Sequence, residues 1–132
     1  MKQTAMLTTA SLLTILFMTI HLAGDILFRM APAGLVNLLA VFIFVVQLYG
    51  TLVLAGRRVG YIIIFFGSAL GLLIPVMHMK GTRGVIGGDI GTSSQAFLFV
   101  WTILALSITA TFSLILSASA LLSLPWRRSR RG

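Results

Sequence analysis

The sequence has no cysteine, and its only acidic residues are Asp25 and Asp89. The lack of cysteine excludes disulfides, thiol redox chemistry, Fe–S clusters and cysteine-ligated zinc. It also excludes a quinone-linked mechanism of disulfide formation. No complete catalytic motif is present, which favours a role other than that of an enzyme.

Charged residues of either sign make up only 9% of the chain, whereas 58% of its residues are hydrophobic and the mean hydropathy is +1.08. A chain of 132 residues cannot hide so many apolar side chains in a small core, because small domains have too much surface. A lipid bilayer replaces the missing interior. The composition therefore predicts an integral membrane protein with a single domain.

Four apolar segments predict an all-α membrane protein with four transmembrane helices. The first segment carries no charge between Lys2 and Asp25, which at ~1.5 Å per residue is enough to cross a ~30 Å hydrocarbon core. Most of the connections are short, so an up-down-up-down bundle is expected. The expected helices cover residues 4–27, 35–55, 59–79 and 95–124.

The basic residues predict the orientation of this bundle. Seven of them fall on the side of the two termini and three on the other side, which places both termini in the cytoplasm and the glycine-rich loop 80–94 outside. We therefore expect a multi-pass protein of a bacterial inner membrane, with a basic cytoplasmic tail at 127–132 and Trp126 as an interface anchor. Topology thus explains the net charge of +8, and nucleic acid is not an expected partner. The seven are Lys2, Arg57, Arg58, Arg127, Arg128, Arg130 and Arg131, and the three are Arg29, Lys80 and Arg83.

Two patterns predict how the helices pack. Gly67 and Gly71 form a GxxxG element, which lets a second helix approach closely. Asn37 and Gln47 belong to a stripe with heptad-like spacing and are expected to form interhelical hydrogen bonds, worth about 0.6 kcal/mol each.

A polar stripe in the first helix is the most informative local feature. Thr14, Met18, His21 and Asp25 follow one another at i, i+4, i+7 and i+11, which places them on one helical face. Such a face is costly next to lipid, so it is expected to point into the bundle.

The topology predicts that His21 and His78 meet at the outer end of the bundle, because the first and third helices both run outward. His21, His78 and Asp25 are therefore candidate cofactor-binding residues, and His21, His78, Met18 and Met77 are candidate metal ligands. Imidazole with thioether suits copper, especially Cu(I). Two histidines from different helices can instead ligate one haem iron, and a His–Asp pair can exchange protons with a quinone head.

Other roles for the same residues remain open. Histidines at the interface often bond to water or headgroups, methionine fills apolar gaps, and Asp25 has a possible partner in Arg29. The first expectation is accordingly an accessory or assembly subunit that packs against a larger membrane complex or against itself. A small proton-coupled transporter is a further alternative, weakened because Asp25 lies near the surface and the middle of the first helix has no carboxylate.

Overall fold

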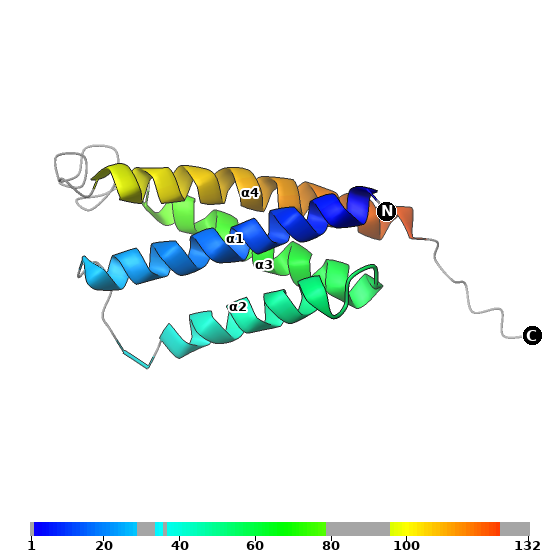
Figure 1. Cartoon of the computed structure of the whole chain (residues 1–132), viewed down its shortest axis with the longest axis horizontal. Coiled ribbons are helices and arrows are strands. Elements are labelled where there is room, and N and C mark those ends of the chain that lie inside the picture. The colour runs from blue at the N-terminus through cyan, green and yellow to red at the C-terminus, as the bar shows by residue number, and fades with distance from the viewer. Residues whose placement is uncertain (1, 29–33, 36, 79–95, 125–132) are drawn as a thin grey trace, which may run out of the picture.

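The computed structural model describes residues 2–28, 34–35, 37–78 and 96–124. These residues form an all-α four-helix bundle in which consecutive helices run antiparallel (Figure 1). Each observed helix end lies within three residues of its expected position. The expected loop 80–94, Trp126 and the tail 127–132 lie outside the described residues. The helices are α1 (Lys2–Leu27), α2 (Asn37–Leu52), α3 (Arg58–His78) and α4 (Ala96–Ser123).

Three of the helices, α1, α3 and α4, are long and apolar enough to cross a membrane, so the chain is a small multi-pass helical membrane protein by the length and composition of its helices. The second helix is shorter than the predicted span 35–55. Its 16 residues, Asn37–Leu52, cover about 24 Å at ~1.5 Å per residue. Of the four predicted transmembrane helices, three are therefore long enough to span a membrane, and α2 is shorter than predicted.

The chain leaves α2 early because a tight turn follows it. The backbone N–H of Arg57 donates to the carbonyl oxygen of Leu54 at 3.0 Å, and Gly56 has a φ of 77°. A positive φ at the third residue of the turn is the mark of a type II turn, which favours glycine there. This turn returns the chain into α3, where a Cβ on Gly60 would collide with the Leu54 carbonyl oxygen. Glycine is thus required at position 56, within the turn, and at position 60, in the first turn of α3.

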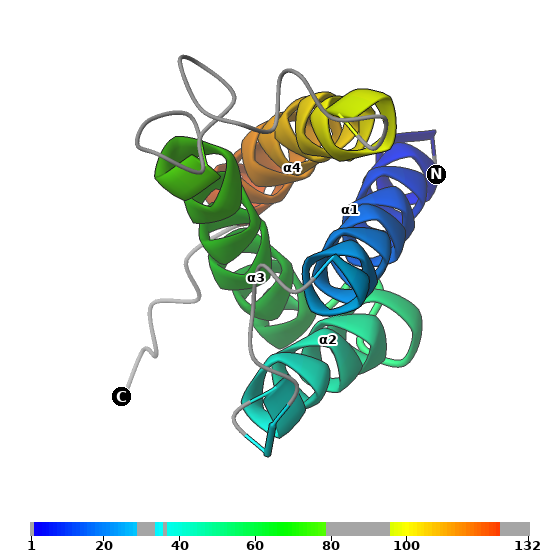
Figure 2. The same cartoon turned by 90° about the vertical axis from the view of Figure 1, so that its left-hand side faces the viewer.

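Each helix packs against the next, and α4 also packs against α1, which closes the bundle. Viewed end-on, α2 lies diagonally opposite α4 (Figure 2). α2 is the least buried helix, with only Gln47, Gly50 and Thr51 buried. All three lie in its C-terminal half, so the N-terminal half of α2 is packed more loosely against its neighbours.

Buried polar side chains link the helices inside the bundle. The Oγ of Ser11 in α1 lies 2.7 Å from the Oγ1 of Thr51 in α2, and the amide nitrogen of Gln47 donates to Ser11 at 3.4 Å. On the other side of the bundle, Ser68 of α3 donates to Ser113 of α4 at 2.8 Å. These bonds satisfy polar groups that lipid would leave without partners.

The two glycines of the GxxxG element face different helices. A Cβ on Gly67 would collide with the side chain of Gln47 in α2. A Cβ on Gly71 would lie 3.2 Å from the Met18 sulfur and 3.5 Å from the Thr14 methyl group, both of which belong to α1. The missing side chains therefore allow two neighbouring helices to approach α3 at successive turns.

Candidate functional site

The polar stripe of α1 points into the bundle, as its spacing predicts. Thr14, Met18, His21 and Asp25 are all buried, and the exposed fractions of His21 and Asp25 are only 3% and 8%. The two ionisable side chains lie in the last two turns of α1, at the end of the bundle that also holds the C-terminus of α3 (Figure 1).

His78 reaches the same place from the last turn of α3. Its Nδ1 lies 2.9 Å from the carbonyl oxygen of Ile74, one turn earlier in the helix. A carbonyl oxygen only accepts, so Nδ1 carries the hydrogen in this bond. The Nε2 of a neutral His78 consequently presents a lone pair, and this atom faces Asp25.

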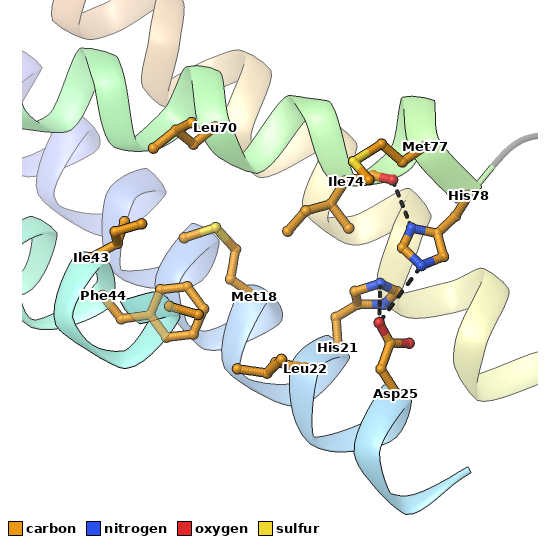
Figure 3. A pocket seen from close by; sticks show the side chains of 11 residues that line it. Met18, His21, Leu22, Asp25, Ile43, Phe44, Leu70, Ile74, Met77 and His78 are labelled. Atoms are coloured by element: carbon orange, nitrogen blue, oxygen red, sulfur yellow. Dashed lines mark hydrogen bonds and ion pairs between the residues drawn. The ribbon is translucent and has the colours of Figure 1, made fainter. Parts of the chain in front are cut away.

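The carboxylate of Asp25 joins the two histidines. Its Oδ2 lies 3.6 Å from the Nε2 of His21 and 3.6 Å from the Nε2 of His78 (Figure 3). The two imidazole rings meet edge to face, with centroids 4.9 Å apart and an interplanar angle of 89°. One ligand atom from each of the three residues lies within 4.8 Å of the other two.

Several polar atoms of this cluster lack a hydrogen-bond partner among the described residues. They are Nδ1 and Nε2 of His21 and Oδ1 of Asp25, all of them buried. A buried polar atom without a partner destabilises a protein by about 1–3 kcal/mol. These atoms therefore offer free hydrogen-bonding or metal-binding positions to a bound species.

The wall of the site on the α4 side is Phe99, which is 4% exposed. Its ring centroid lies 5.2 Å from that of His21 and 5.5 Å from that of His78. Neither this ring nor the Ile74 carbonyl was predicted as part of the site. The segment around Phe99 is almost uniformly apolar, so its sequence carries no periodic signal that marks one residue as inward-facing.

The predicted thioether ligands do not join the imidazoles. Met18 is buried, but its sulfur packs against Gly71 and points away from His21 toward Ile43 (Figure 3). Met77 lies beside His78 in sequence, yet its side chain is 76% exposed. The donor set at the site consequently comprises two imidazoles and one carboxylate.

The arrangement of the rings also bears on haem. Axial imidazoles stand on opposite faces of a haem with the macrocycle between them. His21 and His78 instead contact each other edge to face with centroids 4.9 Å apart, and the Asp25 carboxylate lies against both. The geometry leaves no gap for a macrocycle between the two rings.

The remaining predicted residues lie outside this cluster. Asn37 is the first residue of α2, where its backbone N–H donates to the Gly34 carbonyl oxygen at 3.0 Å. Gln47 lies deeper in the bundle, where it bonds to Ser11. Arg29, the alternative partner of Asp25, lies outside the described residues.

A cavity of about 270 Å³ adjoins the cluster between α1, α2 and α3. The two histidines and Asp25 form its polar end, and the other side chains that line it are apolar (Figure 3). They are Met18, Leu22, Ala40, Ile43, Phe44, Leu70, Ile74 and Met77.

Comparisons of the chain with protein-family models, with curated proteins and with solved structures found no match.

Proposed function

We propose that this protein binds a divalent transition-metal ion, such as Zn²⁺ or Fe²⁺, through His21, Asp25 and His78. In this proposal the protein lies in a bacterial inner membrane with both termini in the cytoplasm, because most of its basic residues flank the ends and the α2–α3 turn. The metal site then lies near the periplasmic surface.

The observation that carries the proposal is the convergence of electron-rich atoms. The Ile74 carbonyl holds the hydrogen of His78 on Nδ1, so a lone pair on Nε2 faces the Asp25 oxygen. His21 directs a further ring nitrogen at the same oxygen. Nitrogen lone pairs that face a carboxylate in a buried site are stabilised by a positive charge between them, either a proton or a metal ion. A metal ion supplies that charge and binds all three groups together.

The distances suit such an ion. Ligands at about 2.0–2.2 Å from a tetrahedral metal lie about 3.3–3.6 Å from one another. The two nitrogen–oxygen separations of 3.6 Å need to contract by at most a few tenths of an ångström, and the three ligand atoms all lie within 4.8 Å of one another. The bond from His78 to Ile74 is also the kind of outer contact that commonly orients a metal-binding imidazole.

The donor set narrows the class of metal. Two imidazoles and a carboxylate suit Zn²⁺ and non-haem Fe²⁺, whereas Cu(I) prefers sulfur and Ca²⁺ and Mg²⁺ prefer oxygen ligands alone. Three protein ligands leave at least one coordination position open.

Metal analysis of the purified protein tests the proposal. The wild type is expected to retain about one equivalent of a divalent transition metal after gel filtration, and His21→Ala, Asp25→Ala and His78→Ala are each expected to lose it. Ser68→Ala is the matched control, because it removes a buried hydrogen bond away from the site and should keep the metal. A metal-free wild type that refuses added Zn²⁺ and Fe²⁺ would contradict the proposal.

A second candidate function is that of an accessory or assembly subunit, and the observation that favours it is the sparse packing of α2. This helix buries only three residues within the bundle, so much of its apolar surface is free to meet a partner helix. In native membranes, a photo-crosslinker attached at Val45→Cys of α2 should capture a partner or a second copy. The same probe at Leu73→Cys of α3, an equally exposed position, should not. Equal capture at both positions would argue against a specific α2 interface.

Proton-coupled transport has weaker support. Asp25 lies in the last turn of α1, whereas a coupling carboxylate is expected near the middle of the membrane. If the protein transports protons, Asp25→Asn should abolish proton uptake by liposomes that contain it, and unchanged uptake would exclude this role.

A further inference from the structure

The cavity beside the histidines has a shape and position suited to a ligand from the lipid phase. It lies between α1, α2 and α3, and its wall on α2 comprises Ala40, Ile43 and Phe44. These residues belong to the N-terminal half of α2, which has no buried residue, whereas Gln47, Gly50 and Thr51 hold the other half in place. A ligand from the bilayer can therefore enter beside the loosely packed half of the helix.

The charges around the cavity argue for a neutral ligand. No lysine or arginine is among the described residues that line it, and its polar end carries the Asp25 carboxylate. A phosphate or carboxylate head would be repelled there, and nothing in the lining would neutralise it. A volume of about 270 Å³ lies near the lower limit for ligand pockets, which suits a single ring with its tail outside.

The unpaired Nδ1 of His21 indicates which polar group the head of this ligand carries. If Nε2 binds the metal, Nδ1 carries the hydrogen and is a buried donor without an acceptor. If no metal is bound and Nε2–H points at Asp25, Nδ1 is a buried acceptor without a donor. A quinone carbonyl supplies the acceptor and a quinol hydroxyl supplies the donor, so one class of molecule meets both needs.

We propose that this cavity binds the ring of a lipid-soluble quinone or quinol. One ring oxygen forms a hydrogen bond with His21, the ring packs against Phe44, and the hydrocarbon tail extends into the bilayer. Because His21 needs a partner with or without a metal, the quinone site does not depend on the proposed metal site.

Binding of a decyl-substituted benzoquinone to the detergent-solubilised protein tests this proposal, measured by equilibrium dialysis before and after metal depletion. We expect saturable one-to-one binding in both states and no displacement by decyl phosphate, which shares the tail but has an anionic head. Absence of saturable binding in both states, or displacement by decyl phosphate, would overturn the proposal. Metal content is measured on the same samples, so loss of the quinone site and loss of the metal site are told apart.

Substitutions in α2 test whether the quinone binds in the cavity. Ala40→Phe fills the cavity and is expected to weaken quinone binding by about tenfold or more while metal content stays unchanged. Val41→Phe adds the same ring on the exposed side of the helix and should leave binding unchanged. Ile43→Phe is a second cavity-filling variant for the case that Ala40→Phe fails to fold. Equal binding by the wild type and a folded cavity-filling variant would show that the ligand lies elsewhere and overturn the proposal.

Discussion

His21 is the side chain whose surroundings most need a functional explanation. It is 3% exposed, both of its ring nitrogens lack a hydrogen-bond partner among the described residues, and it contacts Phe99, His78 and Asp25. In the apo protein this environment is unfavourable, because the imidazole has lost its water without gaining equivalent bonds. In the proposed metal-bound form, the Nε2 of His21 would be a metal ligand, and its burial would then be offset by the bond to the metal.

This contrast gives a stability prediction for His21→Leu. In EDTA the variant should be at least as stable to denaturant as the wild type. The reason is that leucine fills the space of the imidazole without leaving an unpaired polar atom. In saturating Zn²⁺ the wild type should gain about 2.7 kcal/mol at a concentration 100 times the dissociation constant, and the variant should gain nothing. The measurement is reversible unfolding followed by circular dichroism.

The control for this comparison is Ser68→Ala. It removes the hydrogen bond to Ser113, so it should lower the stability by a similar amount with and without metal. A His21→Leu variant that is strongly destabilised in EDTA would show that the imidazole stabilises the fold by itself, and would contradict the metal-site account.

At this residue scale, much of the cluster was predictable from the sequence. The spacing of Met18, His21 and Asp25 predicts their common burial, and the alternating direction of the helices predicts that His78 lies near them. Side-chain rotamers were not predictable, and they decide that the Met18 sulfur turns toward Gly71. The choice between a sulfur-rich copper site and a site of nitrogen and oxygen ligands depends on that detail.

At the scale of the helices, the contact between α2 and α3 is set by glycines and one amide. Gly50 faces Ile63, Gly60 faces the Gly50 carbonyl oxygen, and Gly67 faces Gln47. This seam anchors the C-terminal half of α2. The half that borders the cavity has no buried residue, so the proposed ligand would contact the less tightly held part of the helix.

Gly67→Ala tests this seam. The added methyl group displaces the Gln47 side chain from its place between α3 and Ser11, and overpacking of this kind destabilises proteins by about 1–3 kcal/mol. Gly24→Ala is the matched control, because its Cβ would meet only Phe28 at an ordinary 3.8 Å. Alanine also favours a helix over glycine, so the control should be neutral or stabilising in the same unfolding assay.

A double-mutant cycle with Gln47→Ala identifies which contact causes the destabilisation by Gly67→Ala. If the collision with Gln47 is responsible, Gly67→Ala should destabilise the Gln47→Ala background by much less than it destabilises the wild type. Equal effects of Gly67→Ala in the two backgrounds would show that the methyl group meets some other part of the structure. The free energies come from the same reversible unfolding measurement.

Sequence reasoning was least accurate for α2. The apolar pattern of residues 35–55 does not distinguish a regular helix from apolar residues in a turn, so the end at Leu52 was missed. The place of Gly56 in a turn from Leu54 to Arg57 also depends on the backbone conformation, which the apolar pattern does not reveal. The weak packing of α2 is likewise invisible in a sequence that is apolar on nearly all sides.

At the scale of the whole molecule, the fold brings the buried histidine and aspartate side chains of the described residues to one end of the bundle. The C-terminus of α1, the C-terminus of α3 and the N-terminus of α4 meet there, and they supply His21, Asp25, His78 and Phe99. The other end holds an apolar cluster that includes Leu7, Tyr61, Ile64 and Ala120. The molecule is therefore polarised along its length, and its orientation in the membrane decides which compartment the site faces.

Cysteine labelling tests the orientation, because the natural chain contains no cysteine to interfere. Ser93→Cys in the segment between α3 and α4 should react with a membrane-impermeant maleimide added to intact spheroplasts. Ala55→Cys, in the exposed turn after α2, should react only after the membrane is permeabilised. The reverse pattern would place the histidines on the cytoplasmic side and contradict the basic-residue argument.

The most direct test of the central claim is X-ray absorption at the metal edge, measured on the wild-type protein purified with its metal. We predict a first shell of nitrogen and oxygen at about 2.0–2.2 Å, with the outer-shell scattering of two imidazoles, and no metal-edge signal from His78→Ala. A sulfur shell at about 2.3 Å, or no bound metal at all, would contradict a site formed by His21, Asp25 and His78.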